Sequence, residues 1–264
     1  MRRAWELLKV QLKASALLAL QYRLDFALDL VIGLFWTVSA VLPLFIVYGG
    51  TAKQGVPGWA FGETLVVVAC FITLQAVIDG AISPSLTSVL DHVRKGTFDF
   101  VLLKPHDAQL LVSTARFQFW RAAGLVHAAI VFGLAFRELG RGPTTTGVVT
   151  AAVLLLMATA LLYSLWLLIV SVSFFAVKVD NLSNLFASLF DAARWPKTVF
   201  RGVFRVVFTF VIPLVVMTTF PAEALLGRLS WASLLGAIAG TLAFVLAARL
   251  VWLLSLRRYT SAGG

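Results

Sequence analysis

Long apolar segments separated by short polar stretches dominate the chain. A helix that crosses a bilayer needs about 20 mostly apolar residues. Five runs approach or exceed this length, at about 26–48, 65–82, 122–136, 148–177 and 230–256. Hydrophobic residues make up 60% of the chain and charged residues only 13%, whereas soluble domains have about 25% charged residues. The pattern therefore predicts an all-α integral membrane protein.

The first 22 residues have a different pattern, in which charged residues alternate with apolar ones. One stripe of a helix here would hold Trp5, Leu8, Leu12 and Ala16, with Lys9 and Lys13 on its flanks. Such a helix typically lies in the membrane interface with its basic residues at the lipid headgroups. We expect 1–22 to be an interfacial amphipathic helix before a single transmembrane domain at 23–264. The alternative is a cytoplasmic extension of the first span.

Residues 178–228 contain two apolar pieces, 182–193 and 206–222, and both are shorter than a full span. In one arrangement, 178–205 lies along the inner membrane surface and 206–226 is the fifth span. Four basic residues then stay inside, as the positive-inside rule favours: Arg194, Lys197, Arg201 and Arg205.

In the other arrangement, about 179–198 crosses the membrane and 199–228 forms a re-entrant pair of helices on the outer side. Irregular backbone at membrane depth is tolerated where protein or a water-filled cavity covers it. Both arrangements predict six crossings with both termini inside. In the last span, Gly236 and Gly240 have the spacing that lets two helices approach closely, although a chance match is nearly as good an account.

The longest polar stretch, Asp91–Asp107, contains three Lys or Arg residues, three Asp residues and two His residues. Its punctuation indicates two short helices. A first helix would be capped by Ser83, Ser85 or Thr87, run toward Arg94 and stop at Gly96. A second would begin at Asp99 and end before Pro105. Two short helices beside a membrane form a surface that another protein can bind.

Candidate chemistry is sparse in the rest of the chain. The sequence has no phosphate-binding loop, no Gly-x-Ser-x-Gly, no His-Glu-x-x-His and no Cys-x-x-Cys. We expect no metal site or cofactor in this chain, and for His127 a hydrogen bond between helices. Asp25, Asp29 and Asp79 lie near inner ends of spans. Pairing with Arg23 or with a neighbouring helix is the favoured interpretation, ahead of proton or cation binding.

The formal net charge of +10 does not indicate nucleic-acid binding, because the basic residues lie beside membrane segments and do not form one solvated face with stacking aromatics. Their placement indicates membrane topology and contact with anionic lipids.

Three pieces of the polar stretch, Gly96-Thr97-Phe98-Asp99, Leu102-Leu103 and Pro105, resemble the cytoplasmic signature of ABC-2-type transporter permeases. In addition, Val211-Ile212-Pro213 and Pro221-Ala222 are similar to the family's pattern in the re-entrant helices before the last span. The resemblance therefore favours the second arrangement of 178–228. It implies six transmembrane helices, with a cytoplasmic coupling loop between helices 2 and 3.

The resemblance also implies a function: the permease subunit of an exporter in a bacterial inner membrane, multi-pass, with both termini cytoplasmic. The chain itself would not be an enzyme. ATP and Mg²⁺ would be bound by a separate ATPase subunit docked on residues 83–112, and a second permease, identical or homologous, would complete the pathway. The expected coupling residues are Arg94, Lys95, Gly96, Thr97, Asp99, Leu103 and Pro105.

Two other classes of function compete with this interpretation. An ion-coupled secondary transporter would need ionisable residues near the membrane midplane and often shows internal repeats. The charges here lie mostly at span ends, and we detect no repeat. A lipid-modifying enzyme would need a cluster of acidic or histidine residues at one interface, for which Asp25, Asp29 and Asp79 are the candidates.

Overall fold

The computed structural model describes residues 2–21, 23–49, 55–175 and 180–259, and all regular structure in these ranges is helical. The elements are α1 (Arg2–Gln21), α2 (Arg23–Gly49), α3 (Phe61–Val77), α4 (Ser83–Arg94), α5 (Asp99–Leu102), α6 (Ala108–Ser113), α7 (Ala123–Leu139), α8 (Thr145–Val172), α9 (Asp180–Phe190), α10 (Val203–Val206), α11 (Phe220–Leu225) and α12 (Trp231–Arg257). Short 3₁₀ turns are η2 (Phe119–Ala122), η3 (Asp191–Arg194) and η4 (Lys197–Val199), and π-helical turns are η1 (Ile78–Ile82), η5 (Val207–Val211) and η6 (Val215–Thr219).

Five continuous helices are long and apolar enough to cross a membrane: Ala27–Gly49, Phe61–Arg94, Phe119–Leu139, Thr145–Val172 and Trp231–Arg257. A sixth candidate is the helix pair Val203–Val211 and Val215–Leu225, which bends by 70°. The class predicted from the apolar pattern is therefore confirmed as an all-helical membrane protein with five to six candidate spans.

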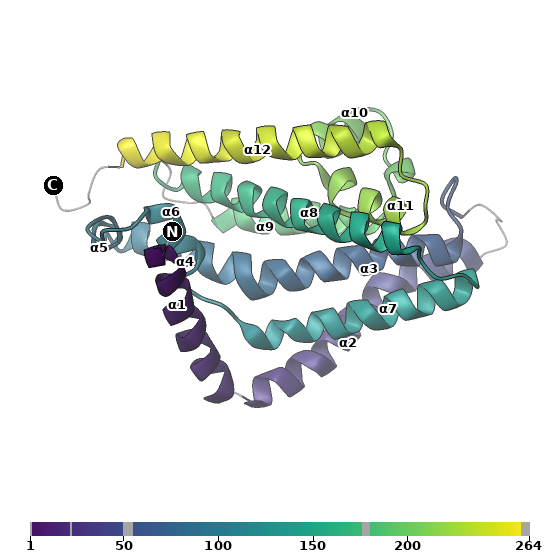
Figure 1. The fold of residues 1–264 in the computed structure, drawn as a ribbon, viewed down its shortest axis with the longest axis horizontal. Helices are drawn as coiled ribbons and strands as arrows, with labels where there is room; N and C mark the ends of the chain where they lie inside the picture. Colours follow the sequence, from purple (N-terminus) through teal and green to yellow (C-terminus); the bar gives the residue numbers. More distant parts are fainter. Residues whose placement is uncertain (1, 22, 50–54, 176–179, 260–264) are drawn as a thin grey trace.

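The span Phe61–Arg94 forms the centre of the bundle. Figure 1 shows α3 surrounded by α2, α7 and α8, with α12 on the far side of α8. Within its most apolar 18 residues, 61% are buried, compared with 17% for the spans in α2 and α12. A helix that is apolar on all sides is either buried in protein or in contact with lipid. We infer that α3 is held by its neighbours, whereas α2 and α12 present most of their apolar side chains to lipid.

The expected side-chain cap from Ser83, Ser85 or Thr87 is wrong. The helix continues from Phe61 to Arg94 through the π-helical turn η1, and Ile82 precedes α4 without a side-chain cap. The Thr87 hydroxyl donates to the Ser83 carbonyl (2.6 Å), and the Ser85 hydroxyl donates to the Arg116 carbonyl (2.5 Å). Inside a helix, Ser and Thr hydroxyls can bond to the preceding turn or to a neighbouring segment, so these residues do not mark a boundary here.

The two ends of the bundle contain different segments. At one end lie α4, α5 and α6 with the start of α1 and the last turn of α12 (Figure 1); we call this the loop end. At the opposite end lie the start of α3, the turn between α7 and α8, and α11. Because α8 runs toward the loop end and α12 starts at the opposite end, residues 173–230 must make one net passage between them.

That passage is irregular. Helix α9 extends to the middle of α3, where Phe190 packs against Phe71 (ring centroids 5.2 Å). At the opposite end, a Cβ at Gly147, in the first turn of α8, would lie 2.7 Å from the Ala224 carbonyl oxygen of α11. The bend between η5 and η6 lies in the break that contains Ile212 and Pro213. The bent pair is compatible with both arrangements of 178–228, as one broken span or as a re-entrant loop.

Candidate functional site

The backbone of the polar stretch follows the predicted punctuation. Gly96 has φ = +63°, a conformation that glycine adopts without the steric cost that Cβ imposes. It ends α4, and the Thr97 amide then donates to the His92 carbonyl at 2.9 Å. The short helix α5 begins at Asp99 and ends before Pro105, as predicted.

Phe98 holds this loop to the bundle. Its side chain is 0% exposed. Its ring makes edge contacts with Phe174, Tyr259 and Trp252, at centroid distances of 5.2, 5.5 and 6.5 Å. From the sequence alone, Phe98 was given no role of its own within the Gly96–Asp99 motif. The available signal was an aromatic residue inside an otherwise polar stretch.

A polar network joins the other end of the loop to α8 and α12. Asp107 caps α6 by accepting from the Leu110 amide (3.1 Å), and its Oδ2 pairs with Arg249 Nη2 at 2.6 Å. Arg249 also donates to Gln109, and the Tyr163 hydroxyl lies 2.7 Å from Gln109 Nε2. The Ser113 hydroxyl also forms a hydrogen bond with the Tyr163 hydroxyl at 2.6 Å. The five side chains therefore form one connected network. The hydrogen bond from Arg249 lowers the pKa of Asp107 below its ordinary value.

Helix α1 contacts the same region through polar groups. Gln11 donates to the Leu111 carbonyl at 3.4 Å and accepts from the Thr114 hydroxyl. The Phe117 amide donates to the Ser15 hydroxyl at 3.2 Å, and Ser15 is buried. Residues 2–21 of the segment expected to be an interfacial helix are helical, and the face that meets the bundle is polar at these two positions.

The predicted coupling residues divide into two groups. Gly96 and Thr97 shape the turn, and Thr97 also approaches His92 Nδ1 at 2.9 Å. The surface group consists of Arg94, Lys95, Leu103 and Pro105, which are exposed, with Asp99 half-buried. Leu103 is 79% exposed and its neighbour Phe100 is 67% exposed. The structure therefore brings an apolar surface and basic side chains together on one short loop.

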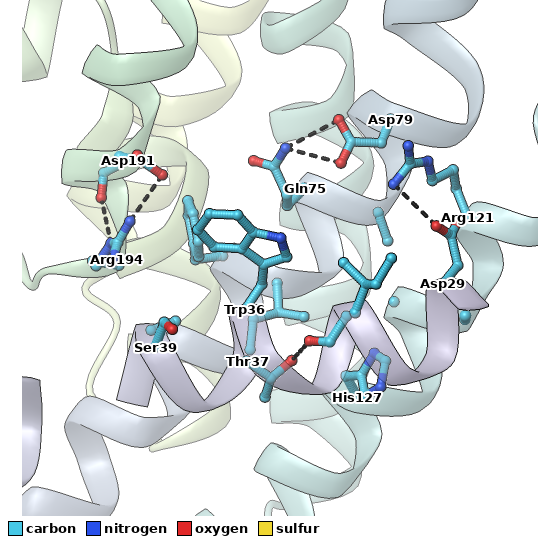
Figure 2. Close-up of a pocket in the computed structure, with 18 of the residues that line it drawn as sticks. Asp29, Trp36, Thr37, Ser39, Gln75, Asp79, Arg121, His127, Asp191 and Arg194 are labelled. Carbon is cyan, nitrogen blue, oxygen red and sulfur yellow. Dashed lines mark hydrogen bonds and ion pairs between the residues drawn. The ribbon is translucent and has the colours of Figure 1, made fainter. Parts of the chain in front are cut away.

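A second polar region lies within the bundle, where a cavity of about 470 Å³ is bordered by α2, α3, α7 and α9. Figure 2 shows its polar lining. Asp29 pairs with Arg121 of η2 at 3.4 Å, which confirms pairing with a neighbouring helical segment. His127 Nε2 lies 3.1 Å from the Leu30 carbonyl and joins α7 to α2, as predicted. The side chain of Arg23, the other partner considered, lies outside the described residues.

Two further expectations from the sequence concern a metal site and close packing of helices. Among the described residues, no three His, Cys, Asp or Glu side chains are placed to hold a metal ion. A Cβ at Gly236 or Gly240 would meet no atom within 4 Å, so these glycines do not mediate packing inside the described part of the chain. Close helix approach occurs instead at Gly124, where a Cβ would lie 2.8 Å from the Ala76 Cβ.

An all-helical bundle with five to six candidate spans and a polar cavity among them is the architecture of a multi-span membrane protein. Residues 34–263 match the family described as ABC-2 family transporter protein, and the chain therefore belongs to that family. No curated protein and no solved structure matches the chain. Membrane subunits of this family lack ATPase activity, so the chain is not itself an ATPase.

Proposed function

We propose that this chain is the permease subunit of an ABC-2-type exporter and that ATP hydrolysis in a separate ATPase subunit drives it. The observation that carries the proposal is the construction of the 83–112 region. Its outer surface presents Phe100 and Leu103 to solvent, while Phe98 in the same loop is fully buried against the ends of α8 and α12. An exposed apolar side chain beside basic ones suits a protein partner.

The same construction provides a route for mechanical coupling. A displacement of α5 would reach α12 through Phe98 and Trp252, and a displacement of α6 would reach it through Asp107 and Arg249. Rigid helices that change their relative positions are a common form of conformational switching. Closure of the ATPase would therefore move α12 and α8 relative to α3 and open the pathway alternately to each side.

The proposed assembly contains two permeases, identical or homologous, and ATPase subunits that bind ATP and Mg²⁺. In this arrangement, the chain is a multi-pass protein of a bacterial inner membrane, and 23–264 form one transmembrane domain. The loop end would face the cytoplasm with both termini. Helix α1 would lie at the interface, where exposed Lys9 and Lys13 can contact lipid headgroups. Residues 199–228 would form the re-entrant helices on the outer side.

Purification from the native host in mild detergent tests the proposal. We expect a stoichiometric second chain with ATP hydrolysis, and its loss with Leu103→Asp. Leu103→Ala and Leu24→Ala form a matched pair, because both leucines are 79% exposed but only Leu103 lies in the loop. Only Leu103→Ala should reduce the amount of ATPase that copurifies. The affinity for the ATPase should fall by about tenfold, as expected for a central apolar contact. Recovery of the protein alone, without nucleotide hydrolysis, would instead favour an ion-coupled secondary transporter.

A further inference from the structure

Two cavities adjoin inside the bundle, and Asp79 lies between them. The 470 Å³ cavity and a second one of about 270 Å³ share Gln75, Asp79 and Ala187 as wall residues. The second cavity extends toward α4, where Ser83 and Thr87 line it. Asp79 therefore stands where a molecule passing from the loop end toward the larger cavity would meet it.

The described lining of the larger cavity carries more negative than positive charge. Three carboxylates face two guanidiniums, and each guanidinium already has a carboxylate partner. Arg121 pairs with Asp29 at 3.4 Å, and Arg194 pairs with Asp191 at 2.9 Å. Among the described residues, Asp79 accepts hydrogen bonds only from the neutral amide of Gln75, at 3.1 Å to each oxygen.

Figure 2 shows Asp79 and Gln75 on one side and the indole of Trp36 projecting between them and the Asp191–Arg194 pair. Arg121 lies on the Asp29 side of Asp79 and acts on it only electrostatically. A carboxylate deep in a membrane protein is costly unless a cation compensates it. Because the two guanidiniums of the cavity are paired with other carboxylates, we infer that a bound ligand supplies the positive charge that balances Asp79.

Aromatic side chains also border both cavities. Phe71 and Phe190 pack together at 5.2 Å between ring centroids, and Trp166 and Phe186 at 5.9 Å. Trp36 is 65% exposed and lines the larger cavity. Aromatic faces attract organic cations through the ring quadrupole. Aromatic faces combined with one uncompensated carboxylate suit a cation with an apolar body.

A further feature also points to a ligand. Asp79 belongs to the π-helical turn η1, and such turns inside α-helices occur frequently at functional sites.

We propose that these joined cavities bind a lipophilic organic cation, with the Asp79 carboxylate neutralising its charge and Trp36 contacting its apolar body. That this cation is the exported substrate rests on the proposed exporter function. Binding itself requires no ATPase, so the two proposals fail separately. The cavities receive the ligand from the loop end through the Ser83 and Thr87 side.

Direct binding to the purified protein in nanodiscs tests the site. The probe is radiolabelled tetraphenylphosphonium, and its competitor is tetraphenylborate, which has nearly the same shape and the opposite charge. We expect saturable binding of the cation without competition by the anion. Asp79→Asn should weaken binding by at least about tenfold, because it removes a charge partner in a desolvated site. Asp79→Glu should retain most of the affinity.

Two further variants keep the result interpretable. Asp91→Asn makes the same change in charge at an exposed position of α4 outside both cavities and should leave the affinity within about twofold. Trp36→Ala, at a side chain exposed enough to be removed without disturbing the fold, should weaken binding about fivefold. Unchanged affinity in both Asp79→Asn and Trp36→Ala, or equal competition by tetraphenylborate, would overturn the site. If Asp79→Asn does not fold, the affinity of Trp36→Ala and the competition by tetraphenylborate test the site instead.

Discussion

The two ends of the bundle are both closed by ion pairs, but the pairs lie in different surroundings. At the loop end, Arg249 and Asp107 are 2.6 Å apart with side chains 37% and 45% exposed. At the opposite end, Lys197 and Glu223 are 2.7 Å apart, and the Glu223 side chain is only 11% exposed. Exposed pairs contribute about 0–1 kcal/mol to stability, whereas breaking a buried pair leaves a charge without compensation.

The contrast teaches where the molecule is rigid and where it is adjustable. A shift of residues 197–228 would expose the Glu223 carboxylate to solvent or separate it from Lys197. Glu223 also lies next to Ala224, which packs tightly against the start of α8. The loop end can exchange its polar contacts with water at small cost, while Phe98 keeps it attached to α8 and α12. A coupling loop must stay attached to the bundle and must also be able to move at a small cost in free energy.

The largest effect is expected at the buried pair. Lys197→Met should lower the free energy of unfolding by about 2–3 kcal/mol, because Glu223 would remain buried without its cation. Unfolding in mixed detergent micelles measures this change. Lys197→Arg preserves the charge and should cost little, and Lys104→Met, at an exposed position of the loop, is the matched control. Equal stabilities for the two methionine variants would remove the contrast between the ends.

The next effect concerns the backbone. Gly96 (φ = +63°) and Gly58 (φ = +76°) adopt the same left-handed conformation at opposite ends of the bundle. Valine at either position should cost about 1–2 kcal/mol or more through backbone strain. We expect only Gly96→Val to uncouple transport from ATP hydrolysis while the protein remains in the membrane. Transport assays on both variants decide, and normal transport by Gly96→Val would argue against coupling through this turn.

The next contrast lies between two arginine contacts whose carboxylates differ in burial. Arg249 pairs with Asp107, which is 45% exposed, at the loop end. Arg228 pairs with Glu63, which is only 13% exposed, at 3.0 Å and stacks over Trp59 at 4.4 Å at the opposite end. Arg249→Met should cost about 1 kcal/mol or less, whereas Arg228→Met should cost about 2–3 kcal/mol, as at Lys197, because it leaves a buried carboxylate without its cation. Hydrogen exchange should increase locally, at 107–113 for the first variant and at 58–63 for the second. Faster exchange at both ends in either variant would mean that the ends are not independent.

The smallest effect is a pH dependence confined to the loop end. The pKa of Asp107 is lowered in the folded protein, mainly by the hydrogen bond from Arg249. Its stabilising contribution is therefore complete above the ordinary pKa, about 3.9, and is lost as the pH falls through the lowered value. Thermal unfolding between about pH 5 and 2.5 should show a steeper acid loss for the wild type than for Asp107→Asn. Parallel curves would contradict the pairing.

Much of the fold was predictable because the decisive interactions are local. A run of apolar residues specifies a membrane helix without any partner, and Gly96 and Pro105 punctuate the loop through their own backbone preferences. The surface residues of the candidate site came from the resemblance of the loop to ABC-2-type permeases, and their coupling role stays a prediction. The anchors of the loop were not predicted: Phe98 was visible only as an apolar residue in a polar stretch, and Arg249 lies 142 residues from Asp107.

The error at Ser83 has the same origin. Ser85 bonds a carbonyl 31 residues away and Thr87 bonds the preceding turn, so hydroxyls that suggest a cap in isolation are satisfied inside a continuous helix. The spacing of Gly236 and Gly240 likewise indicated a close contact, whereas glycines elsewhere in the described chain make such contacts, among them Gly33, Gly124 and Gly147. Spacing identifies which residues permit an approach, but not which helices meet.

The sequence by itself determined the membrane class, the five continuous spans and the turns of the polar loop, because hydrophobicity and backbone preferences act within a few residues. Only the tertiary structure decided that Arg249 and Phe98 hold the loop and that Asp79 lies between two cavities beside aromatic rings. These features arise from contacts between segments tens to hundreds of residues apart, and packing of the whole bundle selects which of the compatible contacts form.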